Sequence, residues 1–185
     1  MAVRIYGNRA IKTLPGEATR PTSSKVREAL FNIWQGRVRG ARWLDLCAGS
    51  GAMGAEALCR GAKQVVGIEK SAAACRVVKA NWQKVAKPEQ TYEVIRADVI
   101  KGITTLSQSF DLVYFDPPYA GKLYEPLLSQ LPDYLAEDGE AAVEYGGGYW
   151  QPHELPETET TTLEIVRQKR YGYTNLVFFR HREKA

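Results

Sequence analysis

A regular alternation of strand-forming and helix-forming segments runs through most of the chain and limits the folds open to it. Alternation of this kind is typical of a parallel sheet whose helices cover both faces. We therefore predict an α/β protein with a doubly wound, mostly parallel sheet. The expected strands are 41–48, 64–70, 91–98, 110–116 and 140–146, and the expected helical segments follow the glycines after residue 48 and cover 71–86 and 99–106.

The two ends of the chain depart from this alternation. Residues 1–18 hold two short apolar pieces broken by turn residues, which predicts a small hairpin or arm. Apolar residues at helical spacing, behind serine and threonine capping candidates, predict a leading helix over 22–36. Near the C-terminus two strand-like runs flank Tyr171-Gly172, so we expect an antiparallel hairpin that closes the sheet.

Two further expectations concern the organisation of the chain. The segment 122–139 is predicted to be a helix that is interrupted near Pro126 or Pro132. At 185 residues the chain is long enough to bury one core. We therefore expect a single domain over 1–185, with a basic N-terminal arm at 1–21, the leading helix, and a core at 41–185.

Composition argues against several classes of protein. The three cysteines form no CxxC pair and the chain has only two histidines, so neither a metal site nor a disulfide framework is expected. No run approaches the roughly 18 apolar residues of a membrane span, and the N-terminus lacks the apolar core of a signal peptide. We expect a cytoplasmic protein with free thiols and no membrane partner.

The formal charge of +4 is unevenly distributed. Residues 1–40 carry eight basic and two acidic side chains, a balance of 8 − 2 = +6, so the remaining residues sum to 4 − 6 = −2. A basic end on a near-neutral body is what a surface that meets a polyanion would need. Charge alone is equally compatible with an ordinary solvated face.

The first expected strand ends in DLCAGSGAMG, Asp45 to Gly54. Gly49, Gly51 and Gly54 satisfy the pattern GxGxxG at a turn from strand to helix. There the missing side chains let the backbone approach a ligand, and the start of the helix presents free N–H groups. This context predicts a cofactor loop.

Two ligands compete for such a loop, a dinucleotide and S-adenosylmethionine (SAM). Asp45, just before the loop, favours SAM, because a carboxylate suits a cationic amino group and would repel a pyrophosphate. Glu69, at the end of the second strand, is placed to accept hydrogen bonds from ribose hydroxyls. Asp98, at the end of the third, is either an acceptor for an adenine amino group or the N-cap of the next helix.

The strand at 110–116 runs directly into Asp116-Pro117-Pro118-Tyr119. The prolines end the strand and hold the backbone rigidly, which suits either a turn or a site. Its position on the same sheet edge as the glycine loop favours a site. Asp116 and the Pro117 carbonyl can accept the hydrogens of a base's exocyclic amino group, and Tyr119 offers a flat surface for a base rotated out of its stack.

The combination of DLCAGSGAMG with FDPPY resembles the Rossmann-type, SAM-dependent amino-methyltransferases. The stretches TRPTSSKVREALFNIW and RQKRYGYTNLVFFR are similar to segments of the bacterial 16S ribosomal RNA guanine-N2 methyltransferases, the RsmD-like family. The resemblance implies transfer of a methyl group from SAM to the exocyclic N2 of a guanine in 16S ribosomal RNA, presented within a small-subunit particle. We expect the enzyme to be a monomer that uses no metal.

Carried over by position, the resemblance assigns the base to Asp116, Pro117, Pro118 and Tyr119. Arg20 and Thr22 either contact the amino-acid end of the cofactor or dock the leading helix. The basic arm and the cluster Arg167, Lys169 and Arg170 are candidate RNA contacts, although the arm is shorter and less basic than the family's hairpin. The expected cofactor residues are Arg20, Thr22, Asp45, Cys47, Ala48, Gly49, Ser50, Gly51, Glu69, Lys70, Asp98 and Val99.

Several alternatives stay open at this point. An adenine-N6 methyltransferase acting on DNA or RNA would use the same DPPY segment, although no sizeable target-recognition domain is evident. A protein-glutamine methyltransferase would carry Asn in place of Asp116. A catalytically silent SAM-binding factor for ribosome assembly would keep the glycine loop alone. A dehydrogenase that uses NAD is disfavoured, because nothing in the sequence is suited to hydride chemistry.

Overall fold

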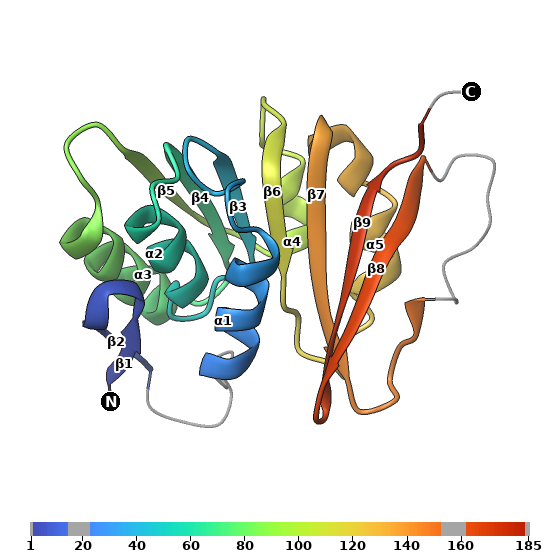
Figure 1. Ribbon diagram of the computed structural model, residues 1–185, viewed down its shortest axis with the longest axis horizontal. Coiled ribbons are helices and arrows are strands. Elements are labelled where there is room, and N and C mark those ends of the chain that lie inside the picture. Colours follow the sequence, from blue (N-terminus) through green and yellow to red (C-terminus); the bar gives the residue numbers. More distant parts are fainter. Residues whose placement is uncertain (1, 15–22, 153–161, 184–185) are drawn as a thin grey trace.

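The computed structural model describes residues 2–14, 23–152 and 162–183, which form a seven-stranded sheet covered by helices and a separate two-stranded hairpin (Figure 1). The sheet has the strand order β5-β4-β3-β6-β7-β9-β8. Its strands are β3 (Arg42–Leu46), β4 (Gln64–Glu69), β5 (Thr91–Arg96), β6 (Phe110–Phe115), β7 (Leu135–Gly146), β8 (Leu163–Tyr171) and β9 (Thr174–His181). The α-helices are α1 (Ser24–Ile33), α2 (Ala52–Cys59), α3 (Ala72–Val85), α4 (Val99–Ile103) and α5 (Tyr124–Leu128).

The five strands from β5 to β7 are parallel, and β9 pairs antiparallel with both β7 and β8. Parallel strands need crossover connections, which the helices provide. Because β4, β3 and β6 are parallel, their carboxyl ends lie at one edge of the sheet, and the reversal of strand order at β3 marks the place where such sheets bind ligands. The predicted doubly wound, mostly parallel sheet with a closing C-terminal hairpin is confirmed.

Helices cover both faces of the sheet, α1 to α3 on one side and α4 with α5 on the other (Figure 1). On the first face Trp43 stacks on Phe31 of α1 and meets Trp34 edge-on. On the second face Phe115 packs against Tyr124 of α5. The alternating side chains of the central strands β3, β4 and β6 therefore fill two separate cores, which is why these strands are apolar almost throughout, whereas the edge strands β5 and β8 are largely exposed.

The expected hairpin and leading helix are present in the described residues. Strands β1 (Ala2–Ile5) and β2 (Arg9–Lys12) flank the 3-10 turn η1 (Tyr6–Asn8), and Ile5 and Ile11 are buried in the core formed by α1 to α3. Ser23 caps α1 by accepting a hydrogen bond from the Val26 N–H at 3.2 Å. The rest of the predicted arm, residues 15–22, lies outside the described residues.

Part of the basic charge near the N-terminus is used inside the fold. Arg27 is only 3% exposed and its Nε lies 2.6 Å from Glu56 Oε2. Arg37 lies 3.1 Å from Glu140 Oε2. Because these two cations are paired with buried carboxylates, the surface available to a polyanion is less basic than the sequence count indicates.

The helix predicted over 122–139 is wrong in its second half. Helix α5 ends at Leu128, a 3-10 turn η2 (Leu131–Tyr134) contains Pro132, and β7 already begins at Leu135. Leu135 pairs with Phe110, but the next pair is Glu140 with Leu112, so the first part of β7 bulges away from β6. Pairing with a neighbouring strand, which a helical pattern cannot reveal, decided the conformation of this segment.

Within the described ranges no helix is long and apolar enough to cross a membrane.

Candidate active site

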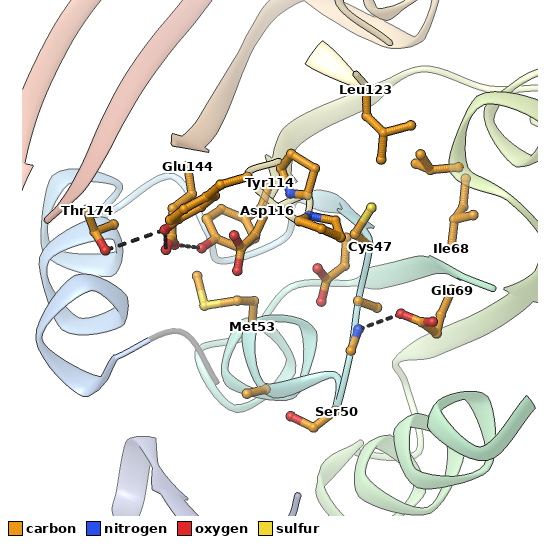
Figure 2. Close-up of a pocket in the computed structure, with 18 of the residues that line it drawn as sticks. Cys47, Ser50, Met53, Ile68, Glu69, Tyr114, Asp116, Leu123, Glu144 and Thr174 are labelled. Atoms are coloured by element: carbon orange, nitrogen blue, oxygen red, sulfur yellow. Dashed lines mark hydrogen bonds between the residues drawn. The ribbon is translucent and has the colours of Figure 1, made fainter. Parts of the chain in front are cut away.

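A cavity of about 830 Å³ opens at the carboxyl edge of the parallel strands. Its walls come from the loop after β3, the ends of β4, β5 and β6, the end of β7, and the turn between β8 and β9. Figure 2 shows Glu69 near one end of this cavity and Glu144 with Thr174 at the other, with Cys47 and Asp116 between them. A cavity of this size can hold a ligand as large as a nucleoside cofactor.

The glycine loop turns sharply between β3 and α2. Cys47 and Gly49 have positive φ angles of 62° and 57°, and Gly51, at 73°, is the N-cap of α2. The loop is tied to β4 by the hydrogen bond from Ala48 N to Ile68 O at 3.1 Å. A left-handed backbone favours glycine, so this part of the motif is required by the turn itself.

Two of the three motif glycines make room for Trp82, a buried residue of α3. A Cβ on Gly51 would lie 2.8 Å from Trp82 Nε1, and one on Gly54 would lie 2.4 Å from Trp82 Cζ2. Gly67 of β4 meets the same ring, with a distance of 2.6 Å to Cη2. Of the motif glycines only Gly49 lines the cavity, so Gly51, which we had expected at the cofactor, does not line it.

Asp45 lies at the floor of the cavity and is almost completely buried. Its Oδ2 accepts a hydrogen bond from Gly54 N at 3.1 Å, which ties the strand to the first turn of α2. Burial raises the pKa of Asp45 to about 8; the Gly54 hydrogen bond opposes this rise and the charge of Glu69 adds to it. A cationic ligand beside Asp45 would relieve the cost of its buried charge.

Glu69 holds the loop and borders the cavity at once. Its two carboxylate oxygens accept from Gly49 N at 2.9 Å and from Ser71 N at 2.8 Å. Each oxygen has a second lone pair, so the side chain can still accept from a ligand hydroxyl. Lys70, the next residue, also lines the cavity.

Asp98 fulfils the helix-capping role that we had weighed against ligand contact. Its Oδ1 accepts from Ile100 N at 3.0 Å at the start of α4. Asp98 and Val99 nevertheless both line the cavity, so capping does not remove Asp98 from the site. The two interpretations are compatible in the structure.

The remaining cofactor candidates divide into residues at the cavity and residues outside the described ranges. Cys47, Ala48 and Ser50 line the cavity. Burial raises the pKa of the Cys47 thiol well above its ordinary value, and nearby carboxylates add to the rise, which favours the protonated thiol over the nucleophilic thiolate. Arg20 and Thr22 lie outside the described residues.

The DPPY segment closes the cavity beside the loop. Asp116 N donates to the carbonyl of Leu46, the last residue of β3, at 3.4 Å, and Gly121 N donates to the Pro118 carbonyl at 2.8 Å. All four residues from Asp116 to Tyr119 line the cavity. The end of β6 is therefore held against the end of β3, where the glycine loop begins.

Tyr119 is held by a hydrogen-bonded group that the sequence did not predict, which we call the Glu144 clasp and define as Tyr114, Tyr119, Glu144 and Thr174. The Tyr119 hydroxyl donates to Glu144 Oε1 at 2.7 Å and lies 3.5 Å from Thr174 Oγ1, and the Tyr114 hydroxyl donates to Glu144 Oε2 (Figure 2). Glu144 is 4% exposed. Burial raises the pKa of Glu144, against the opposing effect of the two tyrosine hydrogen bonds, and burial together with the Glu144 charge raises the pKa of Tyr119.

One signal in the sequence could have found part of this clasp. Glu144 interrupts the apolar run AAVEYG, and an acid inside a buried strand needs partners. Its partners come from β6 and the DPPY segment, and Thr174 of β9 in turn lies beside Tyr119; only the sheet order brings these segments together. The residues that line the cavity and were not predicted are Ser23, Ala52, Met53, Ile68, Ala97, Tyr114, Leu123, Glu144, Tyr171, Gly172, Tyr173 and Thr174.

The arrangement offers acceptor groups along the whole cavity, from Glu69 and Asp45 to Asp116 and Glu144. Such a set suits a ligand rich in hydroxyl, ammonium and amino donors. Among the described residues no group of three or more His, Cys, Asp or Glu side chains is placed to hold a metal ion.

Comparison with known proteins identifies the family. Residues 3–180 match the family model described as Conserved hypothetical protein 95. The putative rRNA methyltransferase YlbH of Bacillus subtilis (strain 168) is 33% identical over 178 residues, covering 94% of both chains. Ribosomal RNA small subunit methyltransferase D of Haemophilus influenzae is 33% identical over 129 residues, 69% of this chain and 67% of that protein. The solved structure of the putative methyltransferase yhhF from Escherichia coli has a TM-score of 0.82 at 27% identity, covering 98% of both chains.

The family model spans nearly the whole chain, and the similarity includes both the glycine loop and the DPPY segment. The resemblance that the sequence motifs predicted is therefore confirmed. The chain belongs to the Conserved hypothetical protein 95 family, the RsmD-like family of Rossmann-type, SAM-dependent methyltransferases.

Proposed function

We propose that the protein methylates the exocyclic N2 of a guanine in 16S ribosomal RNA. The observation that carries the proposal is that the glycine loop and the DPPY segment face one cavity, joined by the hydrogen bond from Asp116 N to Leu46 O. Ribosomal RNA as substrate rests on the names of the relatives. Presentation of the RNA within a small-subunit particle, and action as a monomer, belong to the same proposal.

The residues at the loop end of the cavity fit SAM. Asp45 would meet the cationic amino group, Glu69 the ribose hydroxyls, and Asp98 with Val99 the adenine ring. The loop backbone around Gly49 borders the cavity without a side chain. SAM, when bound, supplies the electrophilic methyl group. No phosphate-binding cation is required for such a ligand, in agreement with the acidic lining.

The residues at the other end would act on the base. An exocyclic amino nitrogen is a poor nucleophile because its lone pair is delocalised into the ring. Asp116 and the Pro117 carbonyl would accept its two hydrogens and so leave the lone pair available. As the new N–C bond forms, the nitrogen becomes cationic, and Asp116 stabilises that charge and can take the released proton. Tyr119, fixed by Glu144, would support the face of the base.

The acceptor-rich lining supports guanine over adenine. Guanine presents N1–H beside its amino group, so that edge consists of donors, whereas adenine presents the acceptor N1 beside its amino group. Near Asp116 the described lining residues include the carboxylate of Glu144 and no lysine, arginine, asparagine or glutamine. An edge made of donors is therefore better matched to this end of the cavity.

The test is methylation of defined substrates with isotopically labelled SAM. Small-subunit particles, naked 16S RNA and duplex DNA are compared, and the modified nucleoside is identified by mass spectrometry. N2-methylguanosine in particles or in 16S RNA supports the proposal. Label in N6-methyladenosine, or in DNA alone, would overturn the guanine assignment.

Asp116→Ala should lower kcat by roughly 10²- to 10³-fold, because it removes an acceptor for the reacting nitrogen. Its affinity for SAM, measured by calorimetry, should stay at the wild-type value. The matched control is Asp133→Ala, which changes an exposed aspartate of η2 and should leave both quantities unchanged. Equal activity of Asp116→Ala and wild type would contradict the assigned role.

A further inference from the structure

The turn between β8 and β9 reaches over the mouth of the cavity. Tyr171 pairs with Thr174, so Gly172 and Tyr173 form a two-residue turn, in which Gly172 has φ +67°. All four residues line the cavity. Thr174 also pairs with Gly146 at the end of β7, which fixes the turn beside the DPPY segment.

Tyr173 presents its ring to solvent on a rigid support. The residue is 94% exposed, the largest value among the exposed large hydrophobic residues of the described ranges. Its backbone, in contrast, is packed: a Cβ on Gly146 would lie 2.6 Å from Tyr173 O and 2.8 Å from Tyr119 Cε2. The ring therefore contributes nothing to the core, whereas the backbone that carries it is packed against Gly146, the residue that also meets the Tyr119 ring.

The basic residues of β8 differ in whether the fold already engages their charged groups. Arg167 lies over the ring of Phe178, 5.5 Å from its centroid, and 4.0 Å from Glu140, so it is engaged within the fold. Lys169 and Arg170 are exposed. Arg170 Nε donates to the Gly172 carbonyl at 3.2 Å, which holds its guanidinium at the turn. An exposed aromatic ring flanked by cations is the combination that binds an unpaired nucleic-acid strand.

We propose that this turn binds the unpaired RNA strand next to the methylated base, with Tyr173 stacking on a neighbouring base and Arg170 and Lys169 contacting phosphates. The inference rests on the proposed function, because it takes the substrate to be RNA. A base that enters the cavity must leave its stack, and its neighbour then loses a stacking partner. Tyr173 lies at the cavity mouth, where it can replace that partner.

The test separates RNA binding from methylation. Binding of a fluorescein-labelled, single-stranded RNA of about ten nucleotides is followed by anisotropy, with a duplex of the same length for comparison. Tyr173→Ala should weaken binding of the single strand about tenfold, whereas Tyr173→Trp should retain it. The matched control is Tyr92→Ala on β5, at the opposite edge of the sheet, which should bind RNA as wild type does. SAM affinity should be unchanged in all three variants.

The cations are tested through salt dependence. Arg170→Gln and Lys169→Gln should each reduce the slope of log affinity against log salt by about 0.7, the value for one lost phosphate contact on a single strand. Lys79→Gln, which removes an exposed cation from α3, should leave the slope unchanged.

Two outcomes would overturn the inference: Tyr173→Ala binding the single strand as tightly as wild type, or Tyr92→Ala losing as much affinity as Tyr173→Ala. Failure of the proposed function gives a different result, in which wild-type protein does not methylate small-subunit particles or their RNA. The binding measurement judges the turn independently of that result.

Discussion

Two buried glutamates four residues apart on β7 face very different surroundings. Glu140, 1% exposed, accepts from Trp34 Nε1 at 2.6 Å, from Arg37 Nη1 at 3.1 Å and from Arg180 Nε at 2.6 Å. Among the described residues, the Glu144 side chain, 4% exposed, accepts only from tyrosine hydroxyls and forms no ion pair with a lysine or arginine. The first lies away from the cavity and the second lines it.

The difference separates a structural charge from a functional one. A buried carboxylate surrounded by cations holds neighbouring elements together, and here it joins α1 to β7 and β9. A buried carboxylate without a cation carries an uncompensated desolvation cost, which is the pattern found at functional sites. We therefore expect Glu140, in the middle of β7, to serve stability, and Glu144, near the carboxyl end of the strand, to serve activity.

The comparison is tested most directly by the matched pair Glu140→Gln and Glu144→Gln. Glu140→Gln should lower the free energy of unfolding by about 2–3 kcal/mol, because it leaves Arg37 and Arg180 without their counter-charge. Glu144→Gln keeps an acceptor for a tyrosine hydroxyl and removes a buried charge, so its effect should stay within about 1 kcal/mol. Urea denaturation at pH 7 measures the free energy of unfolding of both variants. Equal losses of stability would contradict the distinction between a structural Glu140 and a functional Glu144.

The buried carboxyl groups that line the cavity should also make the free energy of unfolding depend on pH. In the folded protein the pKa of Asp45 is about 8, and that of Glu144 is raised as well, both by burial. Above the ordinary carboxyl pKa near 4 the unfolded chain has already lost the Asp45 proton while the folded chain keeps it, so the free energy of unfolding falls as pH rises from about 4 to about 8. For Asp45 the slope should be on the order of 1 kcal/mol per pH unit.

Asp45→Asn should flatten this slope between pH 5 and 8 in denaturation experiments without SAM. The control is Asp111→Asn. Burial acts to raise the pKa of Asp111, but hydrogen bonds from Arg42 outweigh it and lower that pKa. The stability that Asp111 contributes is present above its unfolded pKa and is lost only in more acidic solution. Asp111→Asn should therefore change the free energy of unfolding by the same amount at every pH from 5 to 8, without changing the slope against pH.

The clasp itself should affect activity more than folding. Tyr119→Phe keeps the ring but removes the hydrogen bond to Glu144, so kcat/KM for RNA should fall about tenfold while SAM affinity stays constant. In the double variant Tyr119→Phe with Glu144→Gln, the losses of kcat/KM from the two single variants should not add, because both substitutions weaken the same support of the Tyr119 ring. Full additivity would show that Glu144 does not act through Tyr119.

The smallest effect is expected in the middle of β7, among the arginines around Glu140. Arg180→Gln removes close contacts at 2.5 and 2.6 Å and should lower the free energy of unfolding by about 1 kcal/mol. Arg167→Gln removes a longer contact of 4.0 Å to Glu140 and a cation–π contact of 5.5 Å to Phe178, so its effect should be smaller, about 0.5 kcal/mol. Thermal or urea denaturation can rank the stability losses of the two variants. A larger loss for Arg167→Gln would mean that the distance to Glu140 does not determine how much each arginine stabilises the fold.

Local patterns were sufficient for much of the fold. The strands β3, β4 and β6 and helix α3 were predicted within two residues of their ends, because apolar periodicity and caps are encoded nearby. The start of β7 was not predicted, because Leu135 takes its strand conformation by pairing with Phe110, which is distant in the sequence. Likewise Arg27 and Arg37 counted as surface charge in the sequence, whereas the structure pairs them with buried glutamates.

The candidate site likewise contains features that local sequence patterns predicted and features that depend on distant contacts. Asp45, Glu69, Asp98 and the start of the DPPY segment could be predicted because each lies within two residues of the end of a strand, and parallel strands end at one edge. Gly51 and Gly54 look like ligand glycines in the sequence, but their partner is Trp82 of α3, about thirty residues away, as the printed sequence shows. No local rule distinguishes these two uses of glycine.

The sequence by itself determined the family, the parallel core and the edge at which the acids and DPPY gather, because these follow from periodicity and from residues adjacent in the chain. Only the tertiary structure decided which of two similar glutamates on β7 is neutralised and which supports Tyr119. The reason is physical: the fate of a buried charge depends on partners from distant strands and helices, and the order of strands in the sheet brings those partners together.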